Sequence, residues 1–210
     1  MALLPFISAS RIIICGPSSS GKSELIYNII NHSDKMFDHP ISRIYYFYGM
    51  WQEKFKRNSD TVEYIEGLPT QVFLDEISYE SHKLMVIDDQ QMTALNSRLI
   101  ADLFTKYSHH KNINVILVLQ NLFHQGKFNR DISLNAHCFI LFKNPRDINQ
   151  IKVLSNQLGL KKSLISSYLD ATSVPYSYLL IDLSPMSDST YMLRSNILPD
   201  EHPTIYEYKE

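Results

Sequence analysis

Eight consecutive residues near the start of the chain have the types and spacing of a phosphate-binding loop. They fit the pattern G-x-x-x-x-G-K-[ST] at every fixed position and are Gly16, Pro17, Ser18, Ser19, Ser20, Gly21, Lys22 and Ser23. The glycines let the backbone curl so that its N–H groups face phosphate oxygens. Lys22, a catalytic candidate, would contact the β- and γ-phosphates, and the Ser23 hydroxyl would ligate Mg²⁺. The motif predicts binding of a nucleoside triphosphate.

Two aspartates and a glutamine follow apolar runs further along the chain. Asp88 and Asp89 come directly after the run 84–87, and Gln120 closes the run 115–119. In enzymes with this phosphate loop, the first acid at such a position holds Mg²⁺ through water, and an adjacent acid positions or deprotonates the attacking water. An amide at a strand end can contact both that water and the γ-phosphate. We therefore assign Asp88 to the metal, and Asp89 and Gln120 to catalysis.

The hydrophobic pattern predicts the elements that position these residues. Short apolar runs indicate buried strands at 11–15, 41–48, 62–65, 84–87, 115–119, 138–142 and 178–183, the last at the sheet edge. Helical spacing indicates helices at 22–31, 71–77, 95–107 and 147–157. Strands that alternate with helices predict an α/β class, a P-loop NTPase with a mostly parallel central sheet flanked by helices. Residues 1–210 are expected to form a single domain, with an acidic loop-like tail from about residue 184.

The overall composition excludes several classes of protein. Hydrophobic residues make up 44% and charged residues 20%, which excludes global disorder. The net charge of -2 argues against a wholly cationic nucleic-acid binder but leaves room for a local basic face. Two cysteines allow neither a disulfide framework nor a zinc site. The sequence has no apolar run long enough to span a bilayer, and its first residues lack the basic start of a secretory signal. We expect an intracellular protein without a membrane partner.

The motifs also separate the classes of P-loop protein. A Ras-like GTPase needs the motifs N-K-x-D and D-x-x-G, and the sequence has neither. A nucleotide kinase is expected to carry an arginine-rich lid, and the arginines do not cluster. The second acid, together with an extra strand between the phosphate loop and the acid pair, favours ATPases that use an additional catalytic carboxylate. Two alternatives stay open, a nucleoside or small-molecule kinase and an ATP-gated binding adaptor that hardly hydrolyses ATP.

Several stretches resemble the FtsK/HerA superfamily of P-loop ATPases. They are residues 5–23, 85–89 and 118–123, while 125–135 and 141–147 look like its viral branch, the genome-packaging ATPases of poxvirus-like and Maverick/Polinton-like viruses. The resemblance implies a homo-oligomeric ring that uses ATP and Mg²⁺ to pump double-stranded DNA into a preformed capsid. It also implies a capsid or portal partner and a place of action in the host cell. Many cellular relatives carry glutamate where this chain has Asp89.

A ring of this kind implies an arginine finger, a cation supplied to the transition state from the neighbouring subunit. Arg130 is the leading candidate because it lies in a loop that contains glycine and asparagine after the Gln120 strand. Arg146 is the second candidate. Both arginines also suit an ordinary place on a solvated surface.

A short basic segment is the candidate contact for a DNA backbone. Lys54, Lys56 and Arg57 flank Phe55 in the polar run 52–58, a mixture of cations and an aromatic ring that suits nucleic acid. A solvated, exposed loop is the alternative interpretation of the same run.

Overall fold

The computed structural model describes residues 4–58 and 60–207, and the strands of that part form one nine-stranded sheet. The strands are β1 (Arg11–Cys15), β2 (Ile41–Tyr48), β3 (Val62–Glu66), β4 (His82–Asp88), β5 (Ile113–Leu119), β6 (Cys138–Phe142), β7 (Tyr178–Asp182), β8 (Leu193–Ser195) and β9 (Thr204–Ile205). The helices are α1 (Lys22–Asn31), α2 (Ser33–Met36), α3 (Gln71–Glu76), α4 (Gln91–Leu95), α5 (Arg98–Asp102), α6 (Ser108–His110), α7 (Asn129–Leu134), α8 (Asn149–Leu158) and α9 (Lys161–Ala171). Two 3₁₀ helices, η1 (Glu53–Asn58) and η3 (Ser189–Tyr191), and a π-helix, η2 (Leu103–Tyr107), complete the described elements.

The sheet has the order β3-β2-β4-β5-β1-β6-β7-β8-β9. The strands from β3 to β6 pair in parallel, and β7, β8 and β9 extend the sheet in antiparallel fashion. The predicted α/β class is therefore confirmed. The strand predicted at the sheet edge, β7, is not the edge strand, because β8 and β9 lie between it and the edge. β5 separates the strand of the phosphate loop, β1, from the strand of the acid pair, β4.

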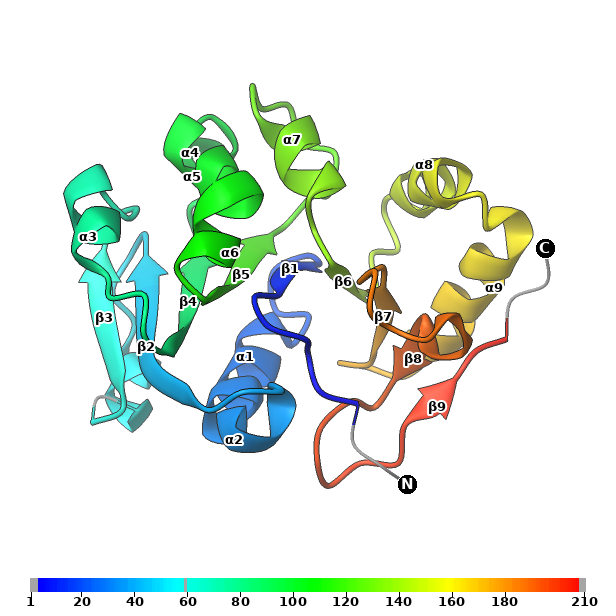
Figure 1. Ribbon diagram of the computed structural model, residues 1–210. Coiled ribbons are helices and arrows are strands. Elements are labelled where there is room, and N and C mark those ends of the chain that lie inside the picture. Colours follow the sequence, from blue (N-terminus) through cyan, green and yellow to red (C-terminus); the bar gives the residue numbers. More distant parts are fainter. Residues whose placement is uncertain (1–3, 59, 208–210) are drawn as a thin grey trace.

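Helices cover both faces of the sheet (Figure 1). In β1, Ile13 and Cys15 belong to the core that is shared with α3 to α5 and α7 to α9. Ile12 and Ile14 belong to the core that is shared with α1, α2 and η1. Successive side chains of a strand point to opposite faces, so a strand covered on both sides needs apolar residues at every position. This requirement explains the uninterrupted apolar runs in the sequence.

Three segments fold differently from the sequence-based expectation. The helix expected at 95–107 begins later, at Arg98, because Ser97 caps it by accepting a hydrogen bond from the Ile100 N–H at 3.4 Å. From there α5, η2 and α6 follow one another without a break up to His110. The loop expected around Arg130 contains α7. The tail expected from residue 184 contains η3, β8 and β9, and the last two form because their backbone pairs with the sheet edge opened by β7.

The polar run 52–58, predicted as an exposed loop, is also different. It forms η1, and the Phe55 side chain is fully buried at 0% exposure. Its ring packs against neighbouring aromatic rings with centroids 4.8–5.4 Å away, those of Tyr46, Tyr48, Trp51 and Tyr64. A single aromatic residue among polar neighbours gives no periodic signal, so its burial depends on partners that other segments supply.

None of the helices in the described ranges is both long enough and apolar enough to cross a membrane.

Candidate nucleotide-binding site

The phosphate loop connects the end of β1 to the start of α1, and two glycines allow its shape. Gly21 has φ 106°, a left-handed conformation that side chains disfavour. A Cβ at Gly16 would lie 2.6 Å from the Cβ of Phe142, the last residue of β6. The loop therefore passes too close to β6 to carry a side chain at its first position. Both fixed glycines of the motif have a steric reason to be there.

Lys22 stands at the first position of α1 and folds back over the loop. Its Nζ donates hydrogen bonds to the carbonyl oxygens of Gly16 and Pro17, both at 2.7 Å. Burial lowers the pKa of Lys22, and the negative charge of Asp88 opposes that shift. The ammonium is thus oriented over the loop beside a carboxylate, as a group that neutralises phosphate requires.

The residues predicted to do chemistry converge on one cleft of about 680 Å³. Lys22 and Ser23 from the phosphate loop, Asp88 and Asp89 from the end of β4, and Gln120 after β5 all line it. Ser18 and Ser19 line the same cleft. The carboxyl ends of neighbouring parallel strands meet at one edge of a sheet, which is why residues about 100 positions apart come together. The volume is in the range of small-molecule sites.

The two aspartates occupy different environments. Asp88 is buried, with 8% of its surface exposed, and its Oδ2 accepts a hydrogen bond from the Tyr46 hydroxyl at 2.6 Å. Burial and the charge of Asp88 raise the pKa of Tyr46, so the hydroxyl stays protonated and remains a donor. Asp89 is exposed and has φ 57°. A Cβ at Gly49 would come within 2.5 Å of the Asp89 carbonyl oxygen, so this turn also needs a glycine beside it.

The donor set at the buried end of the cleft suits Mg²⁺. The Ser23 hydroxyl and the Asp88 carboxylate are both oxygen ligands, which this hard cation prefers. Two protein donors are few, as expected for a metal that keeps several waters and is completed by substrate phosphates. The residues present therefore fit the predicted metal.

Gln120 is exposed at the cleft, and the chain around it is fixed by Gln91 of α4. The Gln91 Oε1 accepts from the backbone N–H groups of Gln120 at 2.6 Å and Asn121 at 3.1 Å. Nothing in the sequence pattern identified Gln91, because a single glutamine on a short helix carries no spacing signal. Its contacts hold the end of β5 against the turn that follows the acid pair.

Lys54 enters the same cleft from η1. Its Nζ donates to the Ser23 Oγ at 2.9 Å, whereas Lys56 is exposed and pairs with Glu53 at 2.6 Å. The side chain of Arg57 lies outside the part of the chain that the structure describes. The structure thus places one cation of the expected DNA segment at Ser23, the serine predicted to ligate the metal.

Arg130 and Arg146 lie elsewhere. Arg130 is exposed on α7, and Arg146 is exposed between β6 and α8. Neither is among the described residues that line the cleft of their own chain.

No family model and no curated protein matches the chain. Solved structures do resemble it in three dimensions. The genome-packaging NTPase B204 of Sulfolobus turreted icosahedral virus 2, in complex with sulfate, has a TM-score of 0.59 at 14% identity and covers 96% of this chain and 97% of its own. The DNA-packaging ATPase B204 of Sulfolobus turreted icosahedral virus has a TM-score of 0.55 at 14% identity, covering 95% and 97%. The cytoplasmic domain of the type VII secretion ATPase EccC from Thermomonospora curvata has a TM-score of 0.54 at 14% identity, covering 96% of this chain and 25% of that one. The chain has the fold of the P-loop NTPases, and its resemblance to FtsK/HerA-type viral packaging ATPases is confirmed at the level of the fold.

Proposed function

We propose that the chain is an ATPase that drives double-stranded DNA into a preformed viral capsid. The observation that carries the proposal is the convergence of Lys22, Ser23, Asp88, Asp89 and Gln120 on one cleft. Further support comes from the B204 structures, which share the fold over nearly the whole chain and include complexes with ATP-gamma-S and AMPPCP. These complexes favour ATP as the nucleotide.

In this proposal each side chain of the cleft has a separate task. The Lys22 ammonium neutralises the β- and γ-phosphates, and Ser23 and Asp88 hold Mg²⁺, which neutralises further phosphate charge when it is bound. The exposed Asp89 carboxylate orients the attacking water and accepts its proton. The Gln120 amide contacts that water and the γ-phosphate.

Lys54 adds a second cation to the phosphate site of its own subunit. Lys54 lines the same cleft as the acid pair, where the γ-phosphate is placed in this proposal. When nucleotide and metal bind, its ammonium moves from Ser23 to the phosphate and leaves the serine hydroxyl to Mg²⁺. A cation in this position stabilises the charge that develops on the transferred phosphoryl group. The buried Phe55 ring next to it anchors η1, so the lysine is supplied by a fixed segment.

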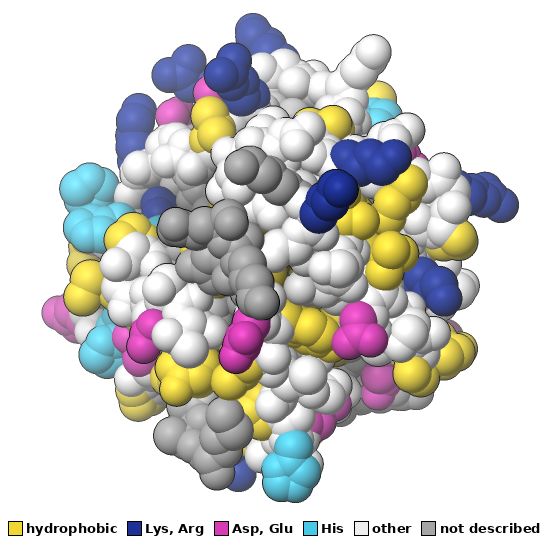
Figure 2. All heavy atoms as spheres, turned by 90° about the vertical axis from the view of Figure 1, so that its right-hand side faces the viewer, with side chains coloured by type: hydrophobic (Ala, Val, Ile, Leu, Met, Phe, Trp, Pro, Cys, Tyr) yellow, Lys and Arg dark blue, Asp and Glu magenta, His cyan; other side chains and the backbone are white. Residues whose placement is uncertain are grey.

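The proposed assembly is a homo-oligomeric ring that contacts a capsid or portal component at the site of virus assembly in the host cell. Arg130 is exposed and lies away from its own cleft, which supports its supply to the cleft of the adjacent subunit. Arg146, exposed in the same way, is the alternative finger. On the face that carries α8 and α9, basic side chains gather over the upper part and acidic ones lie lower, so a chain of net charge -2 still offers a local basic area to DNA (Figure 2).

The test is the rate of phosphate release with and without double-stranded DNA, measured alongside the oligomer mass. The motor predicts a rate that DNA stimulates and that Lys22→Ala abolishes while the fold survives. Transfer of phosphate to a nucleoside would instead support the kinase alternative. Tight ATP binding without turnover would support the adaptor. Wild-type hydrolysis by Lys22→Ala would contradict the assignment of the site itself.

A further inference from the structure

A second hollow adjoins the phosphate loop, apart from the cleft that holds the acids. It has a volume of about 360 Å³ and begins at Gly21 and the first turns of α1. Leu25 of α1 and Tyr178 of β7 are buried parts of its wall, and Leu198 completes the apolar lining. The cleft and this hollow have no lining residue in common, but both adjoin the phosphate loop, the cleft at Lys22 and the hollow at Gly21.

Tyr176 is the unusual residue of this hollow. It is 72% exposed and has φ 66°, a left-handed conformation that is an outlier for a bulky side chain. A Cβ added at Gly21 would lie 3.3 Å from both the Cβ and the Cδ1 of Tyr176, so the side chain stands directly beside the phosphate loop. Strained backbone that presents an aromatic ring to solvent costs stability, and such strain concentrates at ligand sites.

The charges of the two hollows indicate which end of a nucleotide each can hold. Lys22 and Lys54 line the cleft with the acids, so that side suits the γ-phosphate. Glu24 and Glu201 line the second hollow, and its described lining contains neither lysine nor arginine. Two carboxylates disfavour phosphate oxygens at this place. An uncharged, flat and largely apolar group fits the hollow better.

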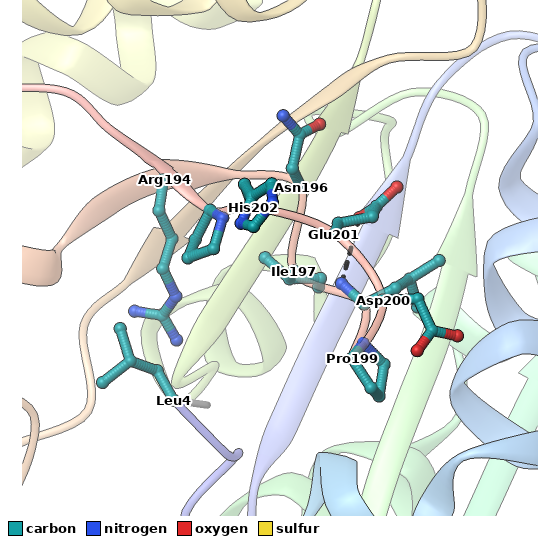
Figure 3. A pocket seen from close by; sticks show the side chains of 10 residues that line it. Leu4, Arg194, Asn196, Ile197, Pro199, Asp200, Glu201 and His202 are labelled. Atoms are coloured by element: carbon teal, nitrogen blue, oxygen red, sulfur yellow. Dashed lines mark hydrogen bonds between the residues drawn. The ribbon is translucent and has the colours of Figure 1, made fainter. Parts of the chain in front are cut away.

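The outer wall of the hollow comes from the segment between β8 and β9, and hydrogen bonds hold it in place. Figure 3, which draws a neighbouring pocket lined by the same segment, shows Glu201 turned back towards its own loop, where its Oε2 accepts from the Leu198 N–H at 3.0 Å. The Tyr178 hydroxyl donates to the same carboxylate at 3.5 Å and accepts from the Ile197 N–H at 3.2 Å. The segment expected from the sequence to be a loop-like tail is therefore tied to the first residue of β7, next to Tyr176.

We propose that this hollow binds the nucleobase of the triphosphate, with the Tyr176 ring stacked on the face of the base. The inference rests on the nucleotide binding proposed above and adds the residue that holds the uncharged end of the ligand. Stacking explains both the exposure of the ring and its strained backbone. Aromatic rings bind the face of any base, so Tyr176 increases affinity and leaves the choice among bases to other contacts.

The experiment compares a ligand that has a base with one that lacks it. Calorimetry measures the Kd of the β,γ-methylene analogue of ATP and of inorganic tripolyphosphate for the wild-type chain, Tyr176→Ala and Tyr176→Phe. The loss of a stacking ring is expected to weaken binding of the analogue about 5- to 150-fold in Tyr176→Ala. Tyr176→Phe keeps the ring and should bind as the wild type does. Tripolyphosphate should bind equally to all three proteins.

Two further variants keep the result interpretable. Tyr176→Gly accepts φ 66° without strain and should lose the same affinity as the alanine variant. Tyr79→Ala removes another exposed tyrosine, 61% exposed and not part of the hollow, and should change nothing. Unchanged affinity of Tyr176→Ala for the analogue, or an equal loss for both ligands, would overturn the base site alone. If the wild-type chain binds neither ligand, the proposed function fails and the base site fails with it.

Discussion

Replacing Lys54 with methionine tests whether this chain supplies a transition-state cation to its own phosphate site. The substitution removes the ammonium that donates to Ser23 at 2.9 Å and keeps the apolar length of the side chain. Phe55, whose buried ring anchors η1, is untouched. The fold should therefore survive, and any change in nucleotide binding should come from the lost charge.

The expected size of the effect follows from the type of bond. A hydrogen bond to a charged group contributes about 1.5–3 kcal/mol, which corresponds to about a 10- to 150-fold change in Kd. Lys54 lines the cleft that contains the acid pair, so a bond of this kind should form with the γ-phosphate when ATP is bound. Lys54→Met should weaken binding of an ATP analogue by that factor, change ADP binding little and slow hydrolysis.

Calorimetry with the ATP analogue and with ADP, combined with steady-state phosphate release, measures all three quantities. Lys56→Met is the matched control, because Lys56 lies on the same 3₁₀ helix but is exposed and paired with Glu53. It should behave as the wild type does. Equal losses for ATP and ADP in Lys54→Met would refute the γ-phosphate assignment, and identical behaviour of the two lysine variants would refute any role for Lys54 in the site.

Three other outcomes are expected. Asp88→Asn should weaken Mg²⁺-dependent nucleotide binding, whereas Asp89→Asn should leave binding nearly intact and lower kcat about a hundredfold or more. Equal nucleotide affinities for the two variants would contradict their separate roles. Arg130→Ala should hydrolyse ATP about 10³-fold more slowly than the wild type. Mixing it with Lys22→Ala subunits should restore some activity, because intact phosphate sites then meet an intact arginine. A mixture that stays inactive would argue against a shared site. Burial, and to a smaller extent a neighbouring arginine, lower the pKa of His137 to about 4. The stability of the folded state should therefore fall as pH drops from about 6.5 towards 4. Urea titrations of His137→Gln should lack this part of the pH dependence.

Several elements of the site could be predicted because their signals are local. The phosphate loop, its preceding strand and its following helix lie within residues 11–31, and each has a pattern that a short window contains. The place of Asp88 and Gln120 at the cleft could be predicted because each ends a buried apolar run, and parallel strands bring their carboxyl ends to one edge. For these residues, the position within a strand or loop was sufficient to predict that they lie at the cleft.

Other contacts carried no local signal. Phe55 and Lys54 lie in a run that reads as polar, and only the aromatic rings of other segments explain why one is buried and the other turned towards Ser23. The helix expected at 95–107 begins only at Arg98, because the Ser97 hydroxyl caps that end. The strands after residue 184 are too short to be recognised from alternation and form because β7 leaves an edge to pair with.

Residue types over a few consecutive positions were enough to predict the phosphate loop and the strand ends that face it, since they decide backbone conformation and charge. Which distant side chains reach that loop depends on the packing of the whole chain. Lys54 meets Ser23 across 31 positions, and Tyr46 meets Asp88 across 42. Tyr176 adjoins Gly21 although most of the chain separates them. These contacts depend on the order of strands in the sheet, which is set by packing of the whole chain and by no single segment.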